Sequence, residues 1–274
     1  MSAEGVRVSP EWLVLREPAD AAARSAELAE RLGRHLPAAG CLVIHDLGGG
    51  SGAMGRWLAP RLPGPQHWVV HDRDAGLLKL AVTDLPGTAA DGVAVTVEAR
   101  RSDITRLAPD DLAGASLIAA SALLDLLTAD ELAVLLGACT GVGCPVLLAL
   151  TVVGRVALTP ADPLDARMAA AFNAHQQRRT ATAGRLLGPD AVAAAVEELR
   201  ATGAEVLVRP SPWRLDAAHA DLTAAWFGGW VAAACEQEPA LAAEAGAYRD
   251  RRLAQAAAGE LAATVDHADL VALP

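Results

Sequence analysis

The sequence predicts a single α/β domain built on a doubly wound, mostly parallel sheet with helices on both faces. Through residue 153, apolar runs of strand length alternate with segments that carry apolar residues at helical spacing. That alternation requires parallel pairing through right-handed crossovers. The chain of 274 residues suits one elaborated domain, and it contains no internal repeat or low-complexity linker.

The strands of the first half are continuous apolar runs, which are typical of strands buried on both faces of a sheet. We expect them at 41–47, 66–72, 92–101, 115–123 and 144–152. Helices are expected at 17–37, before the first strand, and between strands at 53–62, 75–85 and 128–139. Thr128 is the expected N-cap of the last of these helices, and Glu131 completes a capping box with it.

The second half follows a different pattern, in which proline and glycine interrupt the helical segments. Residues 154–203 predict a helical insertion, 204–210 a strand, 220–237 a helix and 262–274 a final strand. The expected sheet therefore has seven strands.

Composition and charge argue against several classes of partner. The net charge is −10, the only lysine is Lys79 and no basic stripe is present, which is a poor match to nucleic acid. No apolar run is long enough to span a bilayer, and residues 1–12 lack the pattern of a signal peptide, so we expect a cytoplasmic protein without membrane contact. The four cysteines have neither CxxC nor zinc-ligand spacing, so we expect no metal site and no disulfide. They are Cys41, Cys139, Cys144 and Cys235.

A run of glycines, "DLGGGSG" at 46–52, follows the first strand and precedes a helix. Ligands bind at this place in open α/β sheets, and glycine lets the backbone approach them closely. Three interpretations compete. A phosphate-binding loop fails because no Gly-Lys-Ser/Thr follows, whereas a dinucleotide fingerprint fits Gly48, Gly50 and Ala53. The third interpretation also uses Asp46, in the pattern D-x-G-x-G-x-G.

That pattern resembles motif I of the class I S-adenosylmethionine-dependent methyltransferases. "HWVVHDRDAGLL" at 67–78 resembles the second motif of the family, with Asp72 at the matching position and Asp74 as a competitor. "ARRSDITRL" at 99–107 resembles the loop after strand three, and "SLIAASALLDLLTADEL" at 116–132 resembles strand four and its loop. The last two expected strands resemble the reversed pair that closes the sheet in this family.

The resemblance implies S-adenosylmethionine as cofactor, S-adenosylhomocysteine as product, and a role for each matching residue. Asp46 and the Gly48 backbone would receive the methionine amino group, and the backbone at Gly50 and Gly52 would approach the amino acid tail. Asp72 would accept the ribose hydroxyls. The remaining cofactor contacts implied are Arg73 beside Asp72, Asp103 on the adenine amino group, Ile104 on the adenine ring, and Ser121.

The acceptor is expected to be a small organic molecule, methylated on oxygen, nitrogen or carbon. The segment 121–125, SALLD, lacks the (D/N)PP(Y/F/W) of enzymes that methylate exocyclic amino groups, and neither a Pro-Cys nucleophile nor metal-binding acids are recognisable. The residue usage is typical of a GC-rich genome, so specialised bacterial metabolism is the expected setting. An NAD(P)-dependent oxidoreductase stays an alternative, although the single tyrosine, Tyr248, and Lys79 are far apart. A non-catalytic binding protein of the same fold also stays open, as does a homodimer.

Candidate acceptor residues come from several segments. Asp125 follows strand four and His175 is the preferred base, so both are candidate catalytic residues. Helical spacing places Phe172, His175, Gln176 and Arg179 on one face. The expected substrate-binding residues are Asn173, Gln176, Arg179 and Trp213. Trp12 and Arg16 are expected in a lid over the cofactor, and Trp226 and Trp230 as packing residues.

These interpretations divide the one domain into four parts. Residues 1–38 form an N-terminal helical cap, and 39–153 form the cofactor-binding half. Residues 154–203 form a helical insertion that serves as a substrate lid, and 204–274 supply the C-terminal strands and helix.

Overall fold

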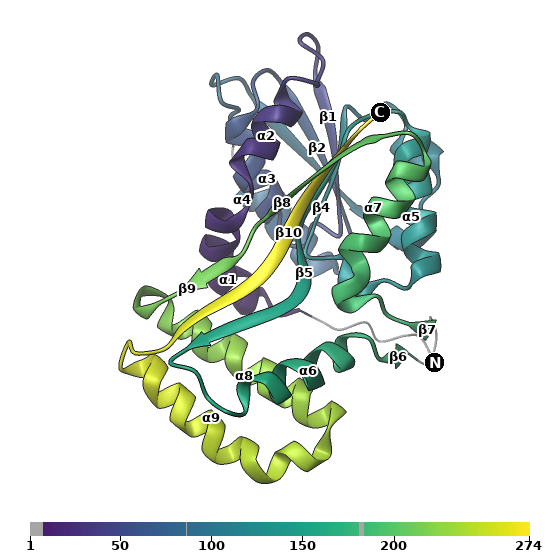
Figure 1. Cartoon of the computed structure of the whole chain (residues 1–274). Coiled ribbons are helices and arrows are strands. Elements are labelled where there is room, and N and C mark those ends of the chain that lie inside the picture. The colour runs from purple at the N-terminus through teal and green to yellow at the C-terminus, as the bar shows by residue number, and fades with distance from the viewer. Residues whose placement is uncertain (1–7, 86, 181–183) are drawn as a thin grey trace.

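The computed structural model describes residues 8–85, 87–180 and 184–274, and it has a central sheet in the order β3-β2-β1-β4-β5-β10-β8 (Figure 1). The pairs from β3 to β5 are parallel, and β10 runs antiparallel between β5 and β8. This confirms the predicted mostly parallel sheet with a reversed C-terminal strand. The strands are β1 Leu42–Leu47, β2 Gln66–Asp72, β3 Val95–Arg101, β4 Leu117–Ser121, β5 Val146–Thr159, β8 Glu205–Pro210 and β10 Ala262–Leu273.

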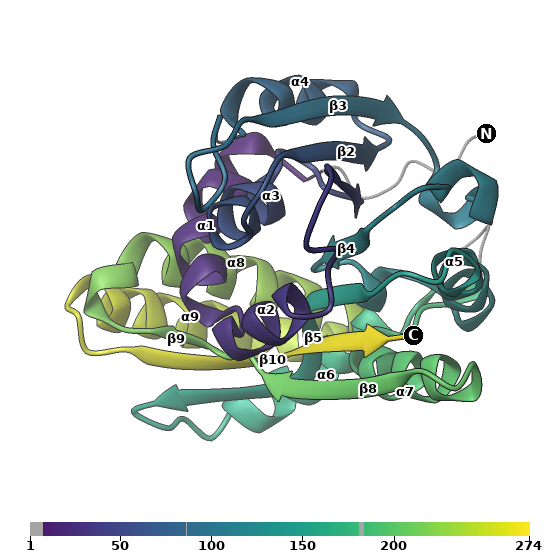
Figure 2. The same ribbon diagram turned by 90° about the horizontal axis from the view of Figure 1, so that it is seen from above.

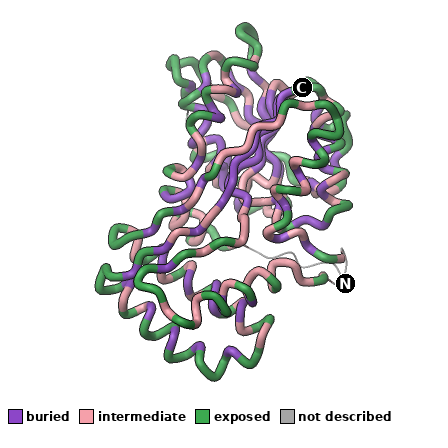
Figure 3. Tube along the Cα trace, viewed as in Figure 1, coloured by how far each residue is buried: buried purple, intermediate pink, exposed green. Residues whose placement is uncertain are grey.

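Helices cover both faces of the sheet, as predicted. The core on one face contains side chains of α2 (Ala26–Gly33) and α3 (Ala53–Leu58), and α4 (Ala75–Asp84) packs against β2 and β3. The core on the other face contains α5 (Ala129–Gly141) and α7 (Ala191–Ala201). Figure 2 shows these two groups on opposite sides of the row of strands, and Figure 3 shows the buried residues concentrated along it.

A second, helical layer lies below the sheet in Figure 1. β5 and β10 extend together into it, from the pair Ala272 and Val146 to the pair Ala262 and Thr159. The layer has its own core and consists of α1 Pro10–Ala23, α6 Asp165–Gln176, α8 Ala220–Gln237, α9 Ala242–Ala257 and the short strand β9 Trp213–Leu215, which pairs with β10. Short 3-10 turns complete the chain at Ala59–Arg61, Ile104–Arg106, Pro109–Leu112, Leu124–Leu126, Gly188–Asp190, Ala217–His219 and Pro239–Leu241.

The predicted bounds of the strand at 66–72 and the helix at 220–237 are confirmed, whereas the single helix at 17–37 is wrong. The chain breaks there into α1 and α2 because Ser25 has other partners. Its backbone N–H donates to the buried Asp269 carboxylate at 2.7 Å, and its hydroxyl caps α2 by accepting from the N–H of Leu28. The helix α9 was not predicted from the sequence.

The segment 154–203 contains more than a helical lid. β5 continues to Thr159, α6 follows, β6 (Arg179–Thr180) and β7 (Gly184–Arg185) form a small hairpin, and α7 packs against α5. The end of β5 and α6 join the helical layer, where α6 packs against α8. Among the described residues, no helix is both long and apolar enough to cross a membrane.

Candidate functional site

Three glycines after β1 give the loop its shape. Gly48, Gly50 and Gly52 have φ angles of 64°, 53° and 85°, in the left-handed region that side chains disfavour. The loop therefore turns sharply at the carboxyl end of β1 and delivers the chain into α3. This is the position at which the sequence predicted a ligand.

Asp46 lies at the base of this loop and is fully buried, with no hydrogen-bond partner for either carboxylate oxygen. Burial raises the pKa of Asp46 to about 7. The charges of Arg24 and Arg56 oppose this rise, whereas the charge of Asp72 adds to it. Gly49 provides the space, because a Cβ on this residue would lie 2.5 Å from Asp46 Oδ2. The loop thus packs directly on a buried carboxyl group that lacks a hydrogen-bond partner.

Asp72 ties the loop to the end of β2. Its Oδ2 accepts the Gly50 N–H at 2.9 Å and its Oδ1 accepts the Asp74 N–H at 2.8 Å, and each oxygen keeps a further lone pair. Asp74, the competitor, caps α4 by accepting the N–H groups of Gly76 and Leu77. Of the two acids, Asp72 therefore faces the glycine loop. The neighbouring Arg73 is exposed.

The other predicted cofactor residues lie after β3 and β4. Asp103 Oδ1 accepts the backbone N–H and the hydroxyl of Thr105, at 3.1 and 2.7 Å, and so starts the 3-10 turn Ile104–Arg106. Burial would raise the pKa of Asp103, but these hydrogen bonds lower it. Ile104 is 5% exposed and belongs to the core. The Ser121 hydroxyl lies 3.1 Å from a guanidinium nitrogen of the buried Arg24.

The helix α1 packs against the glycine loop. Leu13 Cδ1 lies 3.6 Å from the position that a Cβ on Gly50 would take. Glu17 forms a two-point ion pair with Arg56 at 2.6 and 2.7 Å, and Arg56 also donates to the Ser51 carbonyl at 2.6 Å. The ion pair fastens α1 over the loop. Neither residue was predicted from the sequence, although Arg56 stands out as a charge in a short apolar helix.

Arg16 is held in a cage beside this helix. It pairs with Asp20 at 2.9 Å, and its guanidinium carbon lies 5.9 Å from the Trp12 ring centroid and 5.0 Å from that of Trp213. Trp213 is 3% exposed and donates its indole N–H to Asp20 at 2.9 Å. The structure thus places the predicted substrate wall Trp213 in the core of the helical layer, where it positions Arg16.

The Arg16 charge reaches two titratable groups, the partly buried Asp125 and the buried His267. Burial raises the pKa of Asp125, in the turn after β4, to about 6, and Arg16 opposes that rise. Burial lowers the pKa of His267, on β10, to about 4, and Arg16 lowers it further. The His267 ring lies 5.3 Å from Trp213, and its Nδ1 has no partner. His267 was not predicted, because nothing in the sequence places β10 beside α1.

The polar residues of α6 point to separate partners. His175 Nε2 lies 3.4 Å from Glu236, an exposed residue near the end of α8, and Asn173 donates to the Gly154 carbonyl at 2.8 Å. Gln176 packs its Cβ against Gly188. The predicted common face is wrong for Arg179, because α6 ends at Gln176 and the chain turns into the β6–β7 hairpin. Within the described residues, no hydrogen bond, ion pair or ring contact joins His175 to the glycine loop.

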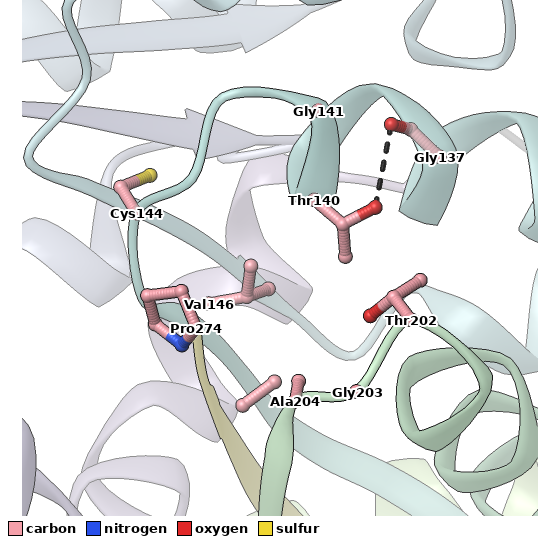
Figure 4. A pocket seen from close by; sticks show the side chains of 10 residues that line it. Gly137, Thr140, Gly141, Cys144, Val146, Thr202, Gly203, Ala204 and Pro274 are labelled. Atoms are coloured by element: carbon pink, nitrogen blue, oxygen red, sulfur yellow. Dashed lines mark hydrogen bonds between the residues drawn. The ribbon is translucent and has the colours of Figure 1, made fainter.

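Pockets lie at both ends of the fold. The larger, about 340 Å³, lies where β5 begins and β10 ends, and small residues such as Gly141 and Ala204 line it (Figure 4). The hydroxyls of Thr140 and Thr202 there already donate to backbone carbonyls. The second, about 270 Å³, lies in the helical layer and is lined by Trp12, Phe172, Ala225, Trp226, Gly229 and Trp230. No group of three or more candidate metal ligands occurs in the described part of the chain.

No protein-family model and no curated protein matches the sequence. Solved structures resemble it along nearly the whole chain. A cyclopropane-fatty-acyl-phospholipid synthase-like protein from Lactobacillus casei has a TM-score of 0.51 at 16% identity, covering 95% of this chain and 92% of its own. The cyclopropane synthase MmaA2 from Mycobacterium tuberculosis has a TM-score of 0.50 at 13% identity, covering 97% and 94%.

A methyltransferase from Geobacter sulfurreducens, crystallised with S-adenosyl-L-homocysteine, has a TM-score of 0.45 at 17% identity and covers 97% of this chain and 98% of its own. At these identities the similarity concerns the fold. Strand order, the reversed last strand and the glycine loop at the end of β1 agree with it. The chain has the fold of the class I S-adenosylmethionine-dependent methyltransferases.

Proposed function

We propose that this protein transfers a methyl group from S-adenosylmethionine to a small organic acceptor. One observation carries the proposal: Asp46 is fully buried at the base of the glycine loop, and neither of its oxygens has a partner. A buried carboxyl group without a hydrogen bond is costly. The cationic amino group of S-adenosylmethionine or S-adenosylhomocysteine is a suitable donor for it.

The residues around Asp46 fit the rest of such a ligand. The lone pairs left on Asp72 suit two ribose hydroxyls, and the positive φ angles of Gly48, Gly50 and Gly52 leave the loop backbone open to the amino acid tail. Asp103 remains the proposed contact of the adenine amino group, through the oxygen that Thr105 does not occupy. Ser121 would line the same site through its contact with Arg24.

When bound, S-adenosylmethionine supplies an electrophilic methyl carbon for an in-line displacement. The chain contributes mainly position, which is worth roughly 7–11 kcal/mol in well-oriented reactions. Asp125, whose pKa is about 6, is suited to take a proton from the acceptor near neutral pH. His175 is the second candidate base, although its neighbour Glu236 lies at the exposed end of α8. The helix α1 shields the loop from water.

The oxidoreductase alternative is weakened by the location of its candidate residues. Tyr248 is fully buried in α9, and its hydroxyl donates to Asp165 at 2.6 Å. Lys79 lies exposed on α4. A hydride-transfer relay built on this pair has no support in the geometry.

Calorimetric titration of the purified protein with S-adenosylmethionine, S-adenosylhomocysteine and NADH tests the proposal. We expect micromolar binding of the first two, none of NADH, and at least tenfold weaker binding by Asp46→Asn. Binding of NADH alone would establish the oxidoreductase instead. A turnover screen across small acceptors then separates an enzyme from a non-catalytic binding protein.

A further inference from the structure

Three helices that are far apart in the sequence line an open apolar pocket of about 270 Å³. Its lining consists of Trp12 from α1, Phe172 from α6, and Ala225, Trp226, Gly229 and Trp230 from α8. We propose that this aromatic pocket holds the apolar ring of the methyl acceptor. The inference rests on the proposed function, since it names the class of molecule on which the same site acts.

The lining selects for flat, apolar groups. The rings of Trp226 and Trp230 are stacked, with centroids 5.7 Å apart and planes at 26°, and the Phe172 ring lies 6.3 Å from Trp230. Aromatic faces favour other rings in offset or edge-on contact. Gly229 and Ala225, four residues apart on α8, leave the space between these rings open, and a Cβ on Gly229 would meet no atom within 4 Å.

The size of the pocket limits the ring system. An engineered apolar cavity of ~150 Å³ accepts benzene. A space of about 270 Å³ is therefore suited to a bicyclic ring or to one substituted ring. Trp230 is 2% exposed and its indole N–H has no partner, which is unusual for a buried tryptophan.

The pocket lies beside the cofactor loop because α1 borders both. Trp12 lines the pocket, and the next residue, Leu13, lies against Gly50. Consecutive helical residues project roughly 100° apart, so the two spaces lie on different sides of the same turn of α1. Arg16 lies one turn further along and keeps its charge over the Trp12 ring. A ring held in the pocket would therefore lie against the same turn of α1 as the glycine loop, where the proposed cofactor binds.

The test uses 2-naphthol, a planar bicyclic probe with one hydroxyl, titrated into the full chain in the presence of S-adenosylhomocysteine. Gly229→Leu fills the pocket, and Gly228→Leu is the matched control because that glycine is also in α8 and also has open space, but does not line the pocket. We expect sub-millimolar binding by the native protein, at least tenfold weaker binding by Gly229→Leu, and native affinity in Gly228→Leu.

Absence of naphthol binding in a protein that binds S-adenosylhomocysteine would overturn the inference, as would equal affinities in the two leucine variants. If Gly229→Leu fails to fold, Trp226→Ala replaces it in the test. Native affinity of Trp226→Ala for 2-naphthol would then overturn the inference. Naphthol binding that responds to these substitutions in a protein without affinity for S-adenosylhomocysteine would support the pocket and contradict the proposed function. The two claims can therefore fail separately.

Discussion

The Asp46 carboxylate packs so closely on Gly49 that a Cβ on this glycine would stand 2.5 Å from Oδ2. It would also stand 2.8 Å from Val70 Cγ1 on the neighbouring strand. Gly49 lies outside the left-handed region that its neighbours Gly48 and Gly50 adopt. The glycine run therefore serves two purposes, since some glycines allow the backbone turn and Gly49 makes room for the acid.

Gly49→Ala is expected to destabilise the protein and to damage the site. The added methyl group must displace the carboxylate or Val70, and overpacking of this kind costs ~1–3 kcal/mol. We expect a lower free energy of unfolding in urea and at least tenfold weaker binding of S-adenosylhomocysteine. Gly246→Ala in α9, where a Cβ meets nothing within 4 Å, is the control and should be neutral or stabilising by up to ~1 kcal/mol. Native affinity in Gly49→Ala would show that the Asp46 position does not matter for binding.

Cofactor binding should depend on pH through Asp46. Its pKa in the free protein is about 7, because it is buried, and a bound ammonium group favours the charged carboxylate. Binding below pH 7 therefore releases a proton, and the dissociation constant of S-adenosylhomocysteine should fall by up to tenfold per unit between pH 5.5 and 7, then level off. Calorimetric titration between pH 5.5 and 7 measures this change in the dissociation constant. Asp46→Asn should abolish the dependence, whereas Asp125→Asn, which removes a group of pKa about 6, should retain it.

The buried pair His45 and His71 should make the fold sensitive to acid. Their rings share a hydrogen bond at 2.9 Å, and burial lowers the pKa of each to about 4. In the unfolded chain both imidazoles become protonated near pH 6.5, whereas in the folded protein they stay neutral until about pH 4. The contribution of the neutral pair to the free energy of unfolding is therefore complete above pH 6.5 and is lost as the pH falls toward 4. At ~1.4 kcal/mol per pKa unit, the loss is about 3.5 kcal/mol for each histidine.

Urea unfolding at pH 7 and pH 5 measures this loss. The double variant His45→Leu, His71→Leu should show a smaller decrease in stability between the two pH values than the native protein. Asp46 acts in the opposite direction, because its raised pKa favours the folded state as the pH falls, but it is present in both proteins and cancels in the comparison. An identical decrease in the free energy of unfolding in both proteins would contradict the assignment of this acid sensitivity to His45 and His71.

Local patterns were sufficient to predict most of the sheet. The bounds of β2 and α8 and the capping box of Thr128 and Glu131 follow from short-range signals, and all three are confirmed. The break between α1 and α2 was not predictable, because it depends on Asp269, which lies far from Ser25 in the sequence. The same holds for the extension of β5 to Thr159, which depends on pairing with β10.

The site was predictable where it follows one strand and not where distant elements meet. The glycine loop and Asp72 lie together in the structure because both end neighbouring parallel strands. The aromatic pocket combines α1, α6 and α8, and sequence spacing indicated only that Trp226 and Trp230 share a helix face. The polar run on α6 was a weaker guide, because Asn173 bonds to β5 and His175 faces Glu236.

Arg16 should control the pKa values of Asp125 and His267 together. A positive charge favours a carboxylate and disfavours an imidazolium, so removing it should raise both pKa values from about 6 and about 4. NMR titration of Arg16→Gln, observing the carboxyl and imidazole carbons, measures both in one sample. Arg167→Gln is the control, since this arginine pairs with Glu238 and Glu244 at the surface, and it should change neither value. If the pKa of only one group changes, the other group lies beyond the reach of the Arg16 charge. The cage of Trp12, Trp213 and Asp20 would then position Arg16 for packing alone.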